Sequence, residues 1–110
     1  MLIKRGADIT TRNKNGETPL HVASCLGLAE VVRMFILRGS DAKAQNKDGR
    51  TPLHLASQQG QKEAALMLIL YRADMMAQDK DGETPLHLAS QEGKEEVARM
   101  LIERAADMTA

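Results

Sequence analysis

The sequence predicts an all-α solenoid, a fold in which one helix-turn-helix unit is stacked on copies of itself. The first observation is the tetrapeptide Thr-Pro-Leu-His, which begins at Thr18 and returns at Thr51 and Thr84. Both intervals are 33 residues, and a fixed period of this size is typical of stacked repeats. The second observation is that apolar residues recur at helical spacing after each tetrapeptide. The third is a glycine between the two helical segments of each repeat, where a tight turn is needed.

Each residue of the tetrapeptide suits the start of an α-helix. Thr is a good N-cap, because its hydroxyl accepts a hydrogen bond from an unpaired amide of the first turn. Pro fits the first helical position, where its missing N–H costs nothing. His stands three residues after the cap, at the second position of a capping box, so its ring can reach back to the Thr. The residues given this structural role are Thr18, Pro19, His21, Thr51, Pro52, His54, Thr84, Pro85 and His87.

We expect two helices in each repeat. The first runs from the Pro to just before Gly27, Gly60 or Gly93, and the second covers an apolar, helix-periodic segment. The second helices are expected at about 29–38, 62–71 and 95–104. Turn sequences rich in Asn, Asp and Gly separate the repeats. The chain is thus predicted to be a single domain, 1–110, with a partial repeat at 1–14 and repeats at 15–47, 48–80 and 81–110.

Composition limits the function classes. The chain carries 15 basic and 15 acidic residues, and it therefore lacks the excess positive charge that binding to nucleic acid or an anionic membrane requires. No apolar run approaches the roughly 18–20 residues of a membrane span. Cys25 is the single cysteine, which fits a reducing compartment, and the first residues do not have the pattern of a signal peptide. We expect an intracellular, cytoplasmic protein that binds neither nucleic acid nor membrane.

Neither the histidines nor Cys25 predicts a reactive site. Histidines one repeat apart are separated by roughly 10 Å, the thickness of a helix layer, which is too far to share a metal ion. We expect buried, neutral, hydrogen-bonded rings, so that the stability falls below about pH 6.5. Cys25 has no recognisable base beside it, and no phosphate-binding loop is present. The sequence therefore predicts no catalytic residue, no metal and no cofactor.

The tetrapeptide and its period resemble the signature of ankyrin repeats. The Ala-Asp pairs at 7–8, 73–74 and 106–107 fit the same pattern, and the resemblance covers essentially the whole chain. The sequence is similar to a fragment of an ankyrin repeat domain or to an engineered ankyrin scaffold. The resemblance implies antiparallel helix pairs stacked side by side, with projecting β-hairpin turns. It also implies a non-enzymatic module that binds another protein through the hairpin tips and the concave face of the first helices.

The resemblance places the partner contacts at matching positions of the repeats. These positions are Lys14, Asn15, Glu17, Cys25 and Leu26, then Lys47, Asp48, Arg50, Gln58 and Gln59, then Lys80, Asp81, Glu83, Gln91 and Glu92. The set is polar and contains no aromatic residue. Because binding hot spots are enriched in Trp, Tyr and Arg, Arg50 is the favoured anchor.

An alternative function is a structural scaffold with no dedicated partner that forms a homo-oligomer. A patch on the second helices could associate with another copy, and its candidate residues are Leu37, Leu66, Leu70 and Tyr71. Two interpretations stay open: a contiguous exposed patch that drives association, or side chains that fold over their own repeat. In the first case Leu70→Glu abolishes association and leaves the fold intact. The uncapped ends offer a second route, since Val97, Leu101 and Ile102 have no obvious following repeat to cover them.

The chain departs from the ankyrin pattern where the second helix ends. Gly6 and Gly39 occupy this position first, and Arg72 and Ala105 replace glycine in the later copies. The residue after a helix end often adopts a left-handed conformation, which glycine tolerates best and which costs other residues about 1 kcal/mol. We therefore expect a less stable corner in the last two repeats.

Overall fold

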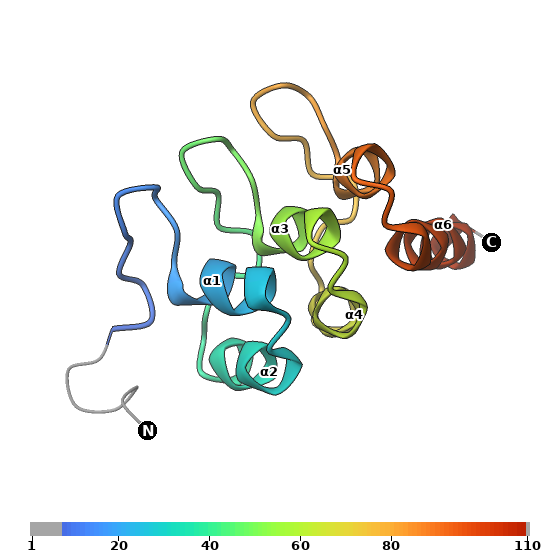
Figure 1. The fold of residues 1–110 in the computed structure, drawn as a ribbon. Coiled ribbons are helices and arrows are strands. Elements are labelled where there is room, and N and C mark those ends of the chain that lie inside the picture. The colour runs from blue at the N-terminus through green and yellow to red at the C-terminus, as the bar shows by residue number, and fades with distance from the viewer. Residues whose placement is uncertain (1–7, 110) are drawn as a thin grey trace.

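The computed structural model describes residues 8–109, which contain six α-helices and no strand. The helices are α1 (Pro19–Leu26), α2 (Ala29–Leu37), α3 (Pro52–Gln58), α4 (Lys62–Leu70), α5 (Pro85–Gln91) and α6 (Glu95–Thr109). Figure 1 shows α1, α3 and α5 in one row and α2, α4 and α6 in a second row, with three long loops projecting beyond the first row. This arrangement confirms the predicted solenoid of helix-turn-helix units.

The predicted helix starts are confirmed, and each is a complete capping box. At α3, the His54 N–H donates to Thr51 Oγ1 at 3.3 Å, and the Thr51 N–H donates to His54 Nδ1 at 3.0 Å. The same two bonds form at α1 and α5, with Pro at the start of each helix. These bonds pair amides that a helix leaves unsatisfied at its N-terminus. The sequence thus sets the helix starts locally.

Packing between repeats buries the core. α1 packs against α3 and α3 against α5, while α2 packs against α4 and α4 against α6. Leu20, Leu53 and Leu68 are completely buried between these layers. Burying one such side chain contributes about 1.5–3 kcal/mol. Each helix pair is therefore stabilised mainly by its neighbours in the stack.

The loops between repeats are hairpin-like turns closed by a side chain. Asn46 Oδ1 accepts from the N–H groups of Asp48 at 2.9 Å and Arg50 at 3.0 Å, and Asn13 and Asp79 close their loops in the same way. Side chains of this kind satisfy turn amides without a strand ladder. The turns therefore project as expected, yet residues 8–109 form no β-strand.

The end of the last helix differs from the expectation. α2 and α4 end one residue before their expected limits, and Arg72 then takes the left-handed conformation with φ 77°. At Ala105 the expected corner is wrong, because α6 continues through it to Thr109. Alanine is the best helix former, so replacing the glycine at this position removes a stop signal and extends the helix.

The expectation that the apolar residues of the last helix lie uncovered is wrong for two of the three. Val97 and Leu101 are buried in the core, because α6 packs on both α4 and α5. Ile102 is 55% exposed, as expected. The exposed apolar surface of α6 is therefore smaller than the sequence suggested.

Candidate functional site

The predicted partner-binding residues lie along the loop tips and the ends of the first helices. We call this set the binding face. Its exposed members are Lys14, Asn15, Leu26, Lys47, Asp48, Gln59, Lys80, Asp81, Gln91 and Glu92, and its partly buried members are Glu17, Cys25, Arg50, Gln58 and Glu83. Figure 1 places the three loops side by side, so the matching positions form columns across the repeats. Their role in binding a partner stays a prediction.

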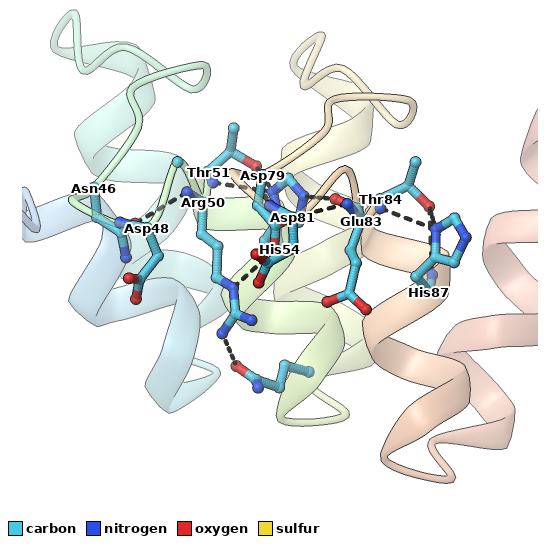
Figure 2. A network of polar contacts seen from close by, with 12 residues as sticks. Asn46, Asp48, Arg50, Thr51, His54, Asp79, Asp81, Glu83, Thr84 and His87 are labelled. Atoms are coloured by element: carbon cyan, nitrogen blue, oxygen red, sulfur yellow. Dashed lines mark hydrogen bonds and ion pairs between the residues drawn. The ribbon is translucent and has the colours of Figure 1, made fainter.

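Arg50 is held by its own chain. Its Nε lies 3.1 Å from Asp79 Oδ2 of the next loop, and its Nη1 donates to Gln58 Oε1 at 3.4 Å. The side chain of Arg50 is 22% exposed and that of Asp79 is 1% exposed. Figure 2 shows Arg50 reaching toward Asp79. The ion pair joins two repeats, so Arg50 is part of the frame as well as a candidate anchor.

Asp79 is the member of this site that sequence reasoning missed. Its Oδ1 accepts the N–H groups of Asp81 and Glu83, each at 2.9 Å. Burial raises the pKa of Asp79, but these amides and the Arg50 guanidinium outweigh burial and hold the pKa below its usual value. A signal was available, because Asn13 and Asn46 occupy the corresponding positions and only the third copy is acidic.

Other residues of the binding face also pair within their own repeat. Gln91 Nε2 donates to Glu83 Oε2, and Asn13 Nδ2 donates to Glu17 Oε1 at 3.2 Å. Within residues 8–109, several side chains of the face make no hydrogen bond or ion pair, namely those of Lys14, Lys47, Asp48, Gln59, Lys80, Asp81 and Glu92. The face therefore combines a self-bonded frame with free polar tips.

Two of the three histidines join one repeat to the next. The Nδ1 of His54 accepts the Thr51 N–H, so the neutral ring carries its proton on Nε2. This Nε2 donates to the carbonyl of Glu83 at 2.8 Å, as His21 Nε2 does to the carbonyl of Arg50 at 2.8 Å. Both rings are completely buried. Burial lowers the pKa of both imidazoles, while the accepting carbonyls act in the opposite direction.

The third histidine differs from the expectation of burial. His87 is exposed, and its Nδ1 pairs with Thr84 as in the other repeats. Its Nε2 finds no acceptor in the part of the chain that the structure describes. Figure 2 shows this ring bonded to Thr84 of its own cap.

Two further groups were candidates for chemistry. Oxygen atoms of Asp79, Asp81 and Glu83 lie within 4.8 Å of one another, but Asp79 already uses both oxygens to hold its loop and Arg50. Burial and the charge of Glu17 raise the pKa of the Cys25 thiol. A raised pKa decreases the thiolate fraction and hence the nucleophilicity. Asp79 thus holds the loop and Arg50, and the Cys25 thiol is a weak nucleophile.

The candidate self-association patch is only partly exposed. Leu37 and Leu70 are 57% and 58% exposed on neighbouring second helices. Leu66 and Tyr71 are partly buried, and Leu66 packs against the core. The interpretation in which side chains fold over their own repeat fits Leu66, whereas Leu37 and Leu70 point outward. Association through this patch stays a prediction.

Comparison with known proteins agrees with this geometry. No curated protein matches the chain, and none of the helices within residues 8–109 is long and apolar enough to span a membrane. The family model described as ankyrin repeats (3 copies) matches residues 1–79 and again residues 26–110. These matches together span the whole sequence, and the helix pairs, capping boxes and turns recur within residues 8–109. The chain therefore belongs to the ankyrin repeat family.

Proposed function

We propose that this chain is a non-enzymatic protein-interaction module that binds another protein across the binding face. Ankyrin repeats generally mediate binding to other proteins and are typically non-enzymatic. The observation that carries the proposal is the contrast within the face between free tips and a bonded frame. Lys47 and Lys80 have free side chains, while their backbone N–H groups bond the preceding loops at 3.1 and 3.0 Å. A frame ordered before binding reduces the entropy lost when a partner docks.

The chemistry of the free side chains favours a polar partner surface of mixed charge. Lys14, Lys47 and Lys80 form one column along the loops, and Asp48 and Asp81 lie beside it. Such a pattern selects a partner by complementary charge and supports the rate of association more than the affinity. Leu26 is the exposed apolar residue of the face, and it is the place where a partner would bury apolar area.

The proposal includes a reducing, intracellular compartment. Cys25 is a free, partly buried thiol at the end of α1. A cysteine kept as a thiol beside a contact surface is compatible with a compartment that maintains thiols reduced. Fluorescence microscopy of the tagged chain tests this part separately.

The test is to isolate partners by affinity capture and then measure the affinity of the purified pair. Lys47→Glu and Glu92→Lys change free, exposed side chains of the binding face, and each is expected to weaken binding at least about tenfold, or 1.4 kcal/mol. The matched control is Glu63→Lys, a charge change at an exposed position of α4, which is expected to leave the affinity unchanged within about twofold. Equal losses for all three variants would contradict the proposal. Arg50→Ala is a poor probe because it also breaks the ion pair with Asp79.

A further inference from the structure

The two junctions between described repeats are built from the same contacts. In each, a histidine Nε2 donates to a carbonyl of the next repeat, at Arg50 and Glu83. In each, a loop N–H donates back to the preceding loop, from Lys47 to the Asn15 carbonyl and from Lys80 to the Asp48 carbonyl. These contacts recur with the repeat period, so they define what a neighbouring layer must supply.

Glycines make room for the neighbouring layer at both junctions. A Cβ on Gly16 would lie 3.0 Å from the Lys47 nitrogen, and one on Gly49 would lie 2.9 Å from the Lys80 nitrogen. Gly27 is covered by the side chain of Gln61 and Gly60 by that of Lys94, and these flexible side chains can shift. The close backbone approach at Gly16 and Gly49 therefore favours glycine at those two positions.

The outer surface of α5, α6 and the third loop has the same features without a neighbour. We call it the C-terminal stack face. His87 Nε2 has no acceptor, and the Asp81 carbonyl has no donor, among residues 8–109. A Cβ on Gly82 or on Gly93 would meet nothing within 4 Å. The C-terminal stack face thus carries the groups that the first two repeats use to bind the repeat that follows them.

Apolar side chains on this face are uncovered as well. Leu86 is partly buried, whereas its equivalents Leu20 and Leu53 are completely buried. Ile102 is 55% exposed, and its equivalents Ile36 and Ile69 are partly buried. Two shallow hollows mark the surface, one at Leu86 and His87 on α5 and one at Ala98 and Ile102 on α6. A layer packed here would fill them.

The opposite end of the stack carries the counterparts of these groups. We call the outer surface of α1, α2 and the first loop the N-terminal stack face. Glu17 is the equivalent of Arg50 and Glu83, and its carbonyl accepts only the Asn13 N–H within the described residues. Lys14 is the equivalent of Lys47 and Lys80, and its N–H has no acceptor there. The missing donors and acceptors of the two faces are therefore complementary.

The shapes of the two faces correspond in the same way. Val22 is 40% exposed, whereas its equivalents Leu55 and Leu88 are 7% and 1% exposed. Leu55 and Leu88 lie on α3 and α5, each of which packs against the first helix of the preceding repeat. Leu28 stands at the position of Gln61 and Lys94, the side chains that cover Gly27 and Gly60. It is exposed, and in a third junction it would cover Gly93.

We propose that the C-terminal stack face docks onto the N-terminal stack face of a second copy of this chain. His87 Nε2 donates to the Glu17 carbonyl of the second copy, and the Lys14 N–H of the second copy donates to the Asp81 carbonyl. Leu86 and Ile102 are covered by α1 and α2 of the second copy. The occupant is a second copy because the N-terminal stack face carries each complementary group at the spacing that the chain's own junctions use.

This contact joins two different surfaces, and it therefore adds copies head to tail without closing. Each added copy comes from solution, so the extent of assembly rises with the concentration of the chain.

The test is the weight-average mass of the full chain, measured by sedimentation equilibrium from about 1 µM to about 1 mM, which spans weak specific association. We expect the mass to rise from 12.1 kDa past twice that value without a plateau. A mass that stays at 12.1 kDa throughout overturns the proposal. A plateau at a closed dimer also overturns it, because a closed dimer uses the same patch on both copies.

Variants of each face separate this mode from others. Ile102→Glu changes one face and Val22→Glu changes the other, and each alone is expected to stay a monomer. An equal mixture is expected to form a dimer and stop, because only one intact face of each kind remains; a mixture that stays monomeric overturns the proposal. His87→Glu is a second variant of the C-terminal stack face, with the capping box retained because Glu suits that position; it too is expected to stay a monomer. Leu70→Glu is the matched control on the exposed side of α4. The mass of this variant is expected to rise with concentration as it does for the unmodified chain. If Leu70→Glu stayed a monomer, the interface would lie at the candidate self-association patch instead.

Discussion

His54 connects the start of its own helix to the next repeat through the two nitrogens of one ring. Nδ1 accepts the Thr51 N–H at 3.0 Å, and Nε2 donates to the Glu83 carbonyl at 2.8 Å. The first bond fixes the tautomer that the second bond needs. Helix capping and repeat stacking are therefore coupled at a single buried side chain, which accounts for the cooperative character expected of a short stack.

The first prediction compares His54→Ala with His87→Ala. His54 is completely buried with both nitrogens bonded, so its removal leaves a cavity and unpaired groups and is expected to cost about 2–4 kcal/mol. His87 is exposed and lacks the second bond, so we expect a cost of about 1 kcal/mol or less. Urea unfolding followed by circular dichroism measures both. Equal costs would show that the bond between repeats contributes little.

The second prediction concerns pH. The pKa values of His21 and His54 are lowered in the folded chain, chiefly by burial. The unfolded chain therefore binds protons first, and the stability is constant above the unfolded pKa of about 6.5 and falls as the pH decreases toward the folded values. The melting temperature is expected to drop between pH 6.5 and 5.5. The double variant His21→Asn/His54→Asn provides the control, because its profile should be flatter over this range; a flat profile for the unmodified chain contradicts the expectation.

The third prediction distinguishes the two tasks of Asp79. Asp79→Asn keeps an oxygen for the Asp81 and Glu83 amides and mimics Asn46, so it is expected to cost about 1 kcal/mol or less. Asp79→Ala removes that acceptor and the Arg50 pair together, and we expect about 2–3 kcal/mol. Chemical denaturation gives both values. Similar costs would mean that the loop amides find other partners.

The same carboxylate predicts a separate effect in acid. The pKa of Asp79 is held below 3.8 by its amide and Arg50 partners, which outweigh its burial. Its contribution to stability is present above the unfolded value of about 3.9 and is lost as the pH falls through the folded value. Asp79→Asn should remove this loss without changing the histidine step near pH 6. A loss below pH 4 that persists in Asp79→Asn would assign it to other carboxylates.

The fourth prediction concerns the corner after α4. Arg72 has φ 77°, a conformation that costs a residue with a side chain about 1 kcal/mol. Arg72→Gly should therefore stabilise the chain, by less than 1 kcal/mol because glycine also increases the entropy of the unfolded state. Gly39→Arg is the reverse change at φ 102° and should destabilise the chain by more than Arg72→Gly stabilises it. A thermal melt that moves in the same direction for both variants would contradict this account.

The sequence predicts the helix starts because their determinants are local. Thr, Pro and His within four residues set the cap, and the observed helices begin at Pro19, Pro52 and Pro85. Helix ends are less predictable, since they depend on the balance between continuing and turning. α6 continues through Ala105 to Thr109, whereas α2 and α4 end before the positions equivalent to Ala105, which are Gly39 and Arg72.

The site could be predicted only in part for the same reason. Exposure of the loop tips follows from the period, whereas the Arg50–Asp79 pair joins residues of different repeats. Reading each repeat alone assigns Arg50 a free guanidinium. Burial of Val97 and exposure of His87 likewise depend on which side of the layer each residue faces, and the period alone does not give that side.

The central claim is that a histidine bonded to two repeats locks each layer to the next. Long-range ¹H–¹⁵N correlation spectra of the imidazole rings, recorded on a dilute monomer at pH 7.5, test it most directly. The account predicts Nε2–H tautomers with slowly exchanging Nε2 protons for His21 and His54, and rapid exchange for His87. Equal exchange at all three rings, or an Nδ1–H tautomer at His54, would contradict it.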